Sequence, residues 1–289
     1  MIDLAITITT FSMMVMLFKY FDKLNVNNLI AITFNYFTAG TLALSSYLIE
    51  NSFIELKTNT NLNLVITALV VGTLFVITFN LYAYSTQKIG ITLSTISNKM
   101  SMVIPILIGI ILFKEEVTFF KILGIFLAIG AILFSSKEDK RSKKLSQINI
   151  IILFLLFIGQ GLADGLLNWG QRNILNSQNM NLFFTLTFLS AGFTGGLYSF
   201  LKIKTSNLNT DKKSIFWGII LGIPNYFSIF FVLRSLDSME SSLVFPILNI
   251  GVVILSALIG WGYYKEHLSK LNWLGVVLAI SAIYILIYA

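Results

Sequence analysis

The chain has 289 residues, of which 56% are hydrophobic and 11% are charged, and its mean hydropathy is +0.83. A soluble domain carries about 25% charged residues, so this composition excludes an ordinary soluble protein and indicates an integral membrane protein. Cysteine is absent and His267 is the single histidine, so disulfides, thiolate nucleophiles and histidine-based metal sites are excluded and we expect neither metal nor cofactor. The net charge of +7 falls in predicted loops and indicates membrane orientation rather than nucleic-acid binding.

Continuous apolar runs predict ten membrane-spanning helices. Each run is near the roughly 20 residues that a helix needs to cross the hydrocarbon, and none shows the alternation of a barrel strand. Short polar hinges join the runs, so successive helices should be antiparallel neighbours. The predicted helices cover residues 2–20, 28–49, 63–86, 90–113, 117–135, 148–171, 181–203, 214–234, 240–263 and 270–288.

A segment that begins near Gly90 recurs 151 residues later in the chain. This offset pairs, without a gap, Asn98 with Asn249, Gly109 with Gly260, Lys114 with Lys265, Glu115 with Glu266, Gly124 with Gly275, Ala128 with Ala279 and Ala131 with Ala282. We therefore predict a five-helix repeat over residues 1–136, a basic linker over 137–147 and a second five-helix repeat over 148–289. Because five is odd, the second copy would enter the membrane from the opposite side.

The predicted fold is all-α, with ten transmembrane helices in two inverted repeats around a central cavity. Inverted repeats are common in secondary transporters, whose binding sites lie between the halves near the membrane midplane. The alternative is a duplicated structural bundle that transports nothing.

Basic residues are distributed unevenly between the two predicted membrane faces. Of the 20 lysines and arginines, Lys57, Lys114, Lys121, Arg172 and Arg234 lie on one face, Lys99 lies inside the membrane, and the others lie on the opposite face. The positive-inside rule places the richer face in the cytoplasm, so both termini should lie outside the cytoplasmic membrane. The basic linker could instead be a lipid-binding patch.

Lys99 and Asp164 are the ionisable residues that should lie deep in the membrane. A charge near the bilayer centre costs roughly 2.5 to 3.5 kcal/mol on insertion scales, so a partner, a cavity or a ligand must compensate it. We expect Lys99 to attract an anionic group such as a carboxylate, and Asp164 to attract an amine or take a coupling proton. The alternative is an ion pair between them that only holds the two halves together.

Other polar and aromatic side chains are candidates to line the same cavity. They are Asn98 and Asn249, which are repeat mates, with Asn80, Tyr82, Tyr84, Gln160, Asn168, Trp169, Asn225 and Tyr226. The two repeat-mate asparagines are as well explained by hydrogen bonds between helices, usually worth about a kcal/mol or less. Trp169 could be an interfacial anchor.

The three prolines Pro105, Pro224 and Pro246 all fall inside predicted spans. Each removes a backbone hydrogen bond and can kink its helix. They are candidate hinges between inward and outward states, with static shaping of the bundle as the alternative. Small residues four apart, such as Gly161 and Gly165, predict close helix packing.

Two segments resemble the end of each repeat of the EamA proteins. They read PILIGIILFKEEVTFFKILGIFLAIGAILF from Pro105 and, as a weaker echo, GVVILSALIGWGYYKEHLSKLNWLGVVLAISAIYILI from Gly251. In this pattern a helix ends in a glutamate and the next helix carries a glycine, here Glu115 with Gly124 and Glu266 with Gly275. EamA proteins belong to the drug/metabolite transporter superfamily. The resemblance implies a ten-helix basket, a central cavity, and export or exchange of small solutes.

The two halves differ where the cavity should lie. The second half has Ile250 at the position of Lys99 and Ser256 at the position of Pro105. The cavity should therefore be chemically asymmetric, with its lysine contributed by one half.

The sequence predicts a transporter rather than an enzyme. We expect a monomer that exports a small polar or zwitterionic metabolite, such as an amino acid, or a drug by alternating access, with protons as a candidate coupling ion. The chain has no phosphate-binding loop, so it should not hydrolyse ATP. The alternatives are a membrane-embedded enzyme for a lipid-linked substrate, which would need a cluster of histidines or acids at one face, and an assembly factor.

Overall fold

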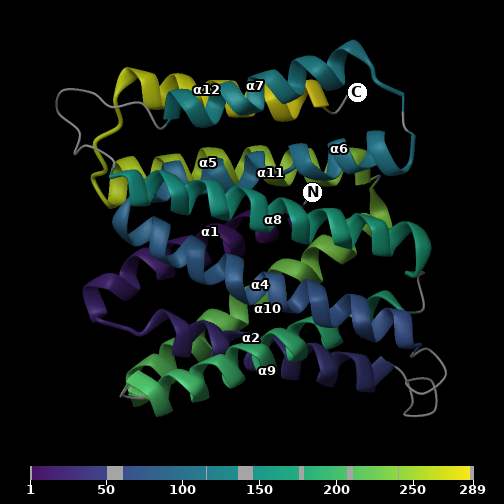
Figure 1. The fold of residues 1–289 in the computed structure, drawn as a ribbon, viewed down its shortest axis with the longest axis vertical. Coiled ribbons are helices and arrows are strands. Elements are labelled where there is room, and N and C mark those ends of the chain that lie inside the picture. The colour runs from purple at the N-terminus through teal and green to yellow at the C-terminus, as the bar shows by residue number, and fades with distance from the viewer. Residues whose placement is uncertain are drawn as a thin grey trace.

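A computed structural model of the protein describes residues 2–50, 61–114, 116–135, 146–175, 179–206, 211–239 and 241–286. Within these ranges the secondary structure is helical (Figure 1). The elements are α1 (Ile2–Leu24), α2 (Asn28–Glu50), α4 (Leu62–Lys88), α5 (Ile91–Met100), α6 (Val103–Leu112), α7 (Phe119–Ser135), α8 (Gln147–Asn173), α9 (Met180–Ser206), α10 (Lys212–Ser238), α11 (Ser241–Leu258), the π-helix η1 (Ile259–Tyr263) and α12 (Lys270–Leu286).

The helices are long and apolar enough to make this an all-α membrane protein. In the described ranges, seven helices qualify as membrane spans by length and composition, and three shorter apolar helices cover Phe119–Ser135, Ile247–Tyr263 and Lys270–Leu286. Every predicted range coincides with a helical segment whose ends differ by about one turn or less. Glu115, Lys57, most of the predicted linker and both terminal residues lie outside the described residues.

The span predicted over 90–113 corresponds to the candidate span Ile91–Leu112, but its helix breaks between α5 and α6 at Ser101 and Met102. Pro105 has no amide hydrogen to donate to the Ser101 carbonyl four residues earlier, and its ring crowds that carbonyl. The Ser101 carbonyl instead accepts a hydrogen bond from the Ile104 amide at 2.9 Å. The proline therefore sets the position of the break.

Several helices begin at a side chain that satisfies an unpaired backbone amide. Asn61 accepts from the Leu64 amide at the start of α4, Ser146 caps α8, and Asp211 accepts from the Ser214 amide at the start of α10. Such caps are typically worth about 1 kcal/mol each. They show why these helices begin where the polar hinges end.

The helices stack in layers across the molecule (Figure 1). α7 and α12 pack side by side at one edge, α5, α6 and α11 lie next to them, and α2 and α9 form the opposite edge beyond α1, α8, α4 and α10. The α7–α12 contact is close because Gly124 lies against Leu286 and Gly275 lies against Ser135.

The bundle has two ends, which we name after one basic residue each. The Lys19 end, at the left of Figure 1, holds the end of α1, the end of α4, the start of α5 and the hinge between η1 and α12. The Arg234 end, at the right, holds the start of α1, the hinge between α6 and α7, and the end of α10. The hinge residues Lys114 and Lys265, which lie at opposite ends, both adopt φ 53°.

Candidate functional site

A cavity of about 410 Å³ lies among α1, α2, α4, α5, α6, α8, α9, α10 and α11. On α8, α9, α10 and α11, the lining residues come from the half of each helix nearer the Arg234 end. The predicted residues that line it are Tyr82, Asn98, Lys99, Pro105, Gln160, Asp164, Asn168, Asn225 and Asn249. The fold thus brings together residues from helices that are far apart in the sequence.

The two charged residues of the cavity lie beyond ion-pair distance of each other, although they interact electrostatically. Among the ion pairs of the described residues there is none between Lys99 and Asp164. The Lys99 ammonium lies 3.9 Å from the ring centroid of Phe11, a cation–π contact worth about 2 kcal/mol when desolvated. An amine and a carboxylate are therefore both presented to the same cavity, from α5 and α8.

A short hydrogen-bond chain holds the carboxylate side of the cavity. The Asn98 amide nitrogen donates to Gln160 Oε1 at 3.2 Å, and Gln160 Nε2 donates to Asp164 Oδ1 at 2.9 Å. These two hydrogen bonds link α5 to α8, so Asn98 and Gln160 both position Asp164. They use Asp164 Oδ1 and leave Oδ2 without a partner among these residues.

The break between α5 and α6 determines where Lys99 lies. Lys99 is in the last turn of α5, where the helix dipole stabilises a cation by about 0.3 to 1 kcal/mol. Ser97 Oγ donates to the Leu153 carbonyl at 2.8 Å, and the hydroxyls of Tyr82 and Thr95 are 2.8 Å apart. These contacts fasten α5 to α8 and α4, so Lys99 projects from an anchored helix end.

Aromatic rings make up much of the remaining wall, and sequence reasoning missed them. They are Phe11, Tyr36, Phe75, Phe79, Phe184, Phe188 and Phe245. Tyr36 packs between Phe79, with ring centroids 5.3 Å apart, and Phe188, at 6.2 Å. The chain has 25 phenylalanines, so the sequence carries no signal that separates these rings from rings that face lipid.

Other predicted site residues lie outside this lining. The Asn80 side chain donates to the Val76 carbonyl of its own helix at 2.8 Å. Tyr84 and Trp169 are exposed at the outside of α4 and α8. Pro224 lies within α10 but does not line the cavity, and the side chain of Pro246 in α11 lies outside the described residues.

Tyr226 lines a second cavity of about 280 Å³, together with Tyr47, Asn181 and Arg234. This cavity lies between α2, α9 and α10, towards the Arg234 end. The two cavities share the lining residues Phe184, Phe188, Ile229 and Leu233. They are therefore neighbours separated by an apolar wall.

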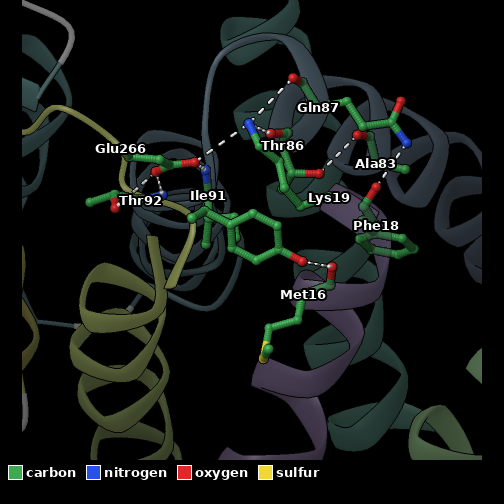
Figure 2. A network of polar contacts seen from close by, with 10 residues as sticks. Met16, Phe18, Lys19, Ala83, Thr86, Gln87, Ile91, Thr92 and Glu266 are labelled. Carbon is green, nitrogen blue, oxygen red and sulfur yellow. Dashed lines mark hydrogen bonds and ion pairs between the residues drawn. The ribbon is translucent and has the colours of Figure 1, made fainter. Parts of the chain in front are cut away.

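At the opposite end, an ion pair connects α1 to the hinge after η1 (Figure 2). Lys19 Nζ lies 3.5 Å from Glu266 Oε1. The same ammonium donates to the carbonyls of Thr86, at 2.8 Å, and Gln87, at 3.3 Å. Lys19 thus joins α1, α4 and the hinge.

The Glu266 carboxylate also caps the start of α5 (Figure 2). It accepts hydrogen bonds from the amides of Ile91, at 2.7 Å, and Thr92, at 3.4 Å. Gly90 has φ 135°, which side chains rarely allow, and a methyl group at Gly260 would lie 2.6 Å from Glu266 Oε2. Both glycines therefore make room for this carboxylate.

Two further contacts complete the network at this end. Gln87 Nε2 donates to the Phe18 carbonyl at 2.8 Å, and the Tyr264 hydroxyl donates to the Met16 carbonyl at 2.9 Å. Burial, with Tyr263, Tyr20 and Glu266 nearby, raises the pKa of Tyr264 to about 12. The hydroxyl therefore stays protonated and can donate at neutral pH.

The repeated glutamate was the one sequence signal for this network. Glu266 stands out as the mate of Glu115 in the recurring segment, but nothing local indicates that its partners lie on α1, α4 and α5. Lys19 and Gln87 carried no signal of their own.

The chain is similar to a family model, to a protein of another organism and to a solved structure. Residues 2–137 match the family model described as the EamA-like transporter family. An uncharacterized protein of Haemophilus influenzae is 30% identical over 278 residues, which cover 94% of this chain and 92% of that protein. A solved crystal structure matches 99% of this chain and 95% of its own, with a TM-score of 0.64 at 10% identity, a likeness of fold alone.

Proposed function

Because the chain belongs to the EamA-like transporter family of the drug/metabolite transporter superfamily, we propose that it moves a small zwitterionic metabolite across the cytoplasmic membrane by alternating access. The observation that carries this proposal is the cavity in which Lys99 and Asp164 present opposite charges without forming an ion pair. A bound carboxylate would compensate Lys99, and a bound amine would compensate Asp164. An amino acid supplies both groups in one molecule.

The proposed architecture is ten crossings in two inverted repeats, 1–136 and 148–289. Reciprocal contacts between the two halves support this architecture. A residue in one half packs on the other half in the same way as its counterpart, at a nearly fixed sequence offset, packs on the first. Gly40 of α2 packs on Leu189 of α9, while Gly192 of α9 packs on Phe37 of α2. The contact between α4 and α9 in the same way corresponds to the contact between α10 and α2. The contact between α8 and α4 corresponds to the contact between α1 and α10. A two-fold relation of this kind is typical of inverted-repeat transporters.

The proposed orientation places the Lys19 end in the cytoplasm and both termini outside. The excess of basic residues at that end supports it. The network of Lys19 and Glu266 closes the cytoplasmic side, and the cavity extends towards the outer side. Export would require the Lys19 end to open, take up substrate and close again.

The test is uptake of radiolabelled amino acids into liposomes that contain the purified protein. Lys99→Met keeps an unbranched side chain that is one atom shorter and removes its charge, so we expect transport to fall at least 10-fold. Lys212→Met, at an exposed position at the start of α10, is the matched control and should transport normally. Normal transport by Lys99→Met would contradict the binding role of this lysine.

Proton coupling is a separate part of the proposal and has its own variant. Asp164 is the candidate proton carrier, and Asp164→Asn cannot exchange a proton. Uptake by this variant should no longer depend on pH between about 5 and 8, while the wild type should respond to an imposed pH gradient. An unchanged pH profile would remove Asp164 from coupling and leave exchange or facilitated diffusion.

Two other classes of function are decided by the same measurement. A membrane-embedded enzyme or an assembly factor would show no uptake above protein-free liposomes for any amino acid or cationic drug. Transport that depends on Lys99 would exclude both as the main function.

A further inference from the structure

The cavity wall formed by α2 and α10 carries polar groups that are distant in sequence from Lys99 and Asp164. Tyr36 on α2 and Asn225 on α10 line the cavity, with 1% and 4% of their surfaces exposed. Asn225 Nδ2 donates to Asn35 Oδ1 at 3.1 Å, so Asn35 stands in direct contact with the wall. Ser228, another lining residue, donates to the Asn225 carbonyl at 2.8 Å.

Two donors in this wall have no hydrogen-bond partner. They are the Tyr36 hydroxyl and the Asn35 amide nitrogen, which belong to adjacent residues. More than nine in ten buried polar groups in proteins are paired, because an unpaired buried group is destabilising. Tyr36 is a lining residue and Asn35 contacts the lining residue Asn225, so an acceptor carried by a ligand in the cavity is the candidate partner for these donors.

The position of these donors defines the length of ligand that could use them. Lys99 lies on α5 and Asp164 on α8, whereas α2 lies in a different layer, towards the opposite edge of the molecule (Figure 1). The rings of Phe79 and Phe188 flank Tyr36. A ligand that fills the cavity would therefore meet charges at one end, rings in the middle and neutral donors at the other end.

We propose that Tyr36, Asn35 and Asn225 form an uncharged subsite that hydrogen-bonds a neutral oxygen at the far end of the substrate. The substrate is thus a zwitterion whose side chain runs past aromatic rings and ends in a hydroxyl, carbonyl or similar acceptor. This inference rests on the proposed transport function and adds the specificity of its site.

The subsite discriminates between molecules that differ by one oxygen. A net hydrogen bond between neutral groups is worth about 0.5 to 1.5 kcal/mol, which corresponds to a preference of roughly 2- to 13-fold for the molecule that carries the oxygen. Removing the Tyr36 hydroxyl removes one donor and should reduce this preference towards 1.

The experiment measures dissociation constants of purified protein for two matched pairs of probes. One pair is L-tyrosine and L-phenylalanine, and the other is L-methionine sulfoxide and L-methionine. In the wild type we expect the oxygen-bearing member of at least one pair to bind several-fold more tightly. Tyr36→Phe should bring that ratio close to 1, and Tyr198→Phe, which removes a phenol oxygen at an exposed site, should preserve it.

The outcomes separate this inference from the function on which it rests. Equal affinity for both members of both pairs in the wild type would overturn the subsite and leave the transporter intact. A wild-type ratio that survives in Tyr36→Phe would also overturn it, because the hydroxyl would then not contact the ligand. Absence of binding by all four probes would overturn the zwitterion site, and the subsite with it.

Discussion

The two ends of the bundle carry ion pairs that differ in burial and in number of partners. Lys19 pairs with Glu266 at one end and Arg234 with Asp3 at the other, both at 3.5 Å, and the Lys19 end also has an exposed pair of Lys88 with Asp22 at 3.1 Å. In the Lys19–Glu266 pair, the side chains are 21% and 13% exposed, and the carboxylate also accepts two backbone amides. At the Arg234 end, the exposures are 63% and 24%, and a second cavity lies beside the arginine.

The lower exposure and the additional hydrogen bonds of the Lys19–Glu266 pair indicate that the Lys19 end resists opening more than the Arg234 end. Hydrogen bonds to a charged group that is shielded from solvent are worth about 1.5 to 3 kcal/mol each, whereas an exposed ion pair is worth about 0 to 1 kcal/mol. Under the proposed alternating access, the Lys19 end would open in the other state, so we expect its closure to depend on very few residues. The absence of cysteine from the chain makes this testable with single introduced cysteines.

The largest effect should follow from Glu266→Ala, which removes the carboxylate from all its partners. With a reporter cysteine at Asn168, a cavity residue, an impermeant maleimide should label the parent protein slowly from the Lys19 end. In Glu266→Ala, labelling from that end should accelerate by about 10-fold or more, because at least one charge-assisted hydrogen bond is lost. Labelling from the Arg234 end provides the internal reference. An unaltered rate from the Lys19 end would show that Glu266 does not hold that end closed.

A smaller increase in labelling should follow when one methyl group is added near the Glu266 carboxylate. A methyl at Gly260 would lie 2.6 Å from Glu266 Oε2 and 2.8 Å from Thr92 Oγ1, whereas one at Gly262 would meet nothing within 4 Å. Gly260→Ala should therefore displace the carboxylate and increase labelling of the Asn168 cysteine from the Lys19 end several-fold. Gly262→Ala, two residues away, should leave labelling unchanged. Equal behaviour of the two variants would mean that the carboxylate moves aside without opening the end.

The helix positions and the two charged cavity residues could be predicted from the sequence. Helix positions were predictable because polar hinges bound each apolar run and the bilayer fixes the length of a span. Lys99 and Asp164 stood out because charges are rare inside spans, and both line the cavity. Their binding role stays a prediction.

The parts that escaped prediction depend on contacts between distant segments. Glu266 bonds to Ile91 and Lys19, and no local pattern specifies such pairings. Tyr36 and Phe11 face the cavity, but an aromatic ring that faces a cavity and one that faces lipid look alike in a sequence. The exchange of Lys99 for Ile250 between the halves was visible, whereas its consequence, a charge beside Phe11, needed the structure.

The smallest effects should come from removing the cation of the Lys19–Glu266 pair or of the Arg234–Asp3 pair. These two variants compare the two ends of the bundle directly. Lys19→Met removes one ion pair and the contacts to Thr86 and Gln87 but leaves Glu266 bonded to the start of α5. Because water can reach the 21% exposed Lys19 position and replace its contacts to the carbonyls and to Glu266, labelling of the Asn168 cysteine from the Lys19 end should rise only about 2- to 5-fold, corresponding to roughly 0.4 to 1 kcal/mol. Arg234→Met removes the more exposed pair, so labelling from either end should change by less than about 2-fold. A larger effect of Arg234→Met than of Lys19→Met would contradict this expectation. It would mean that the Arg234 end is held more strongly than the Lys19 end.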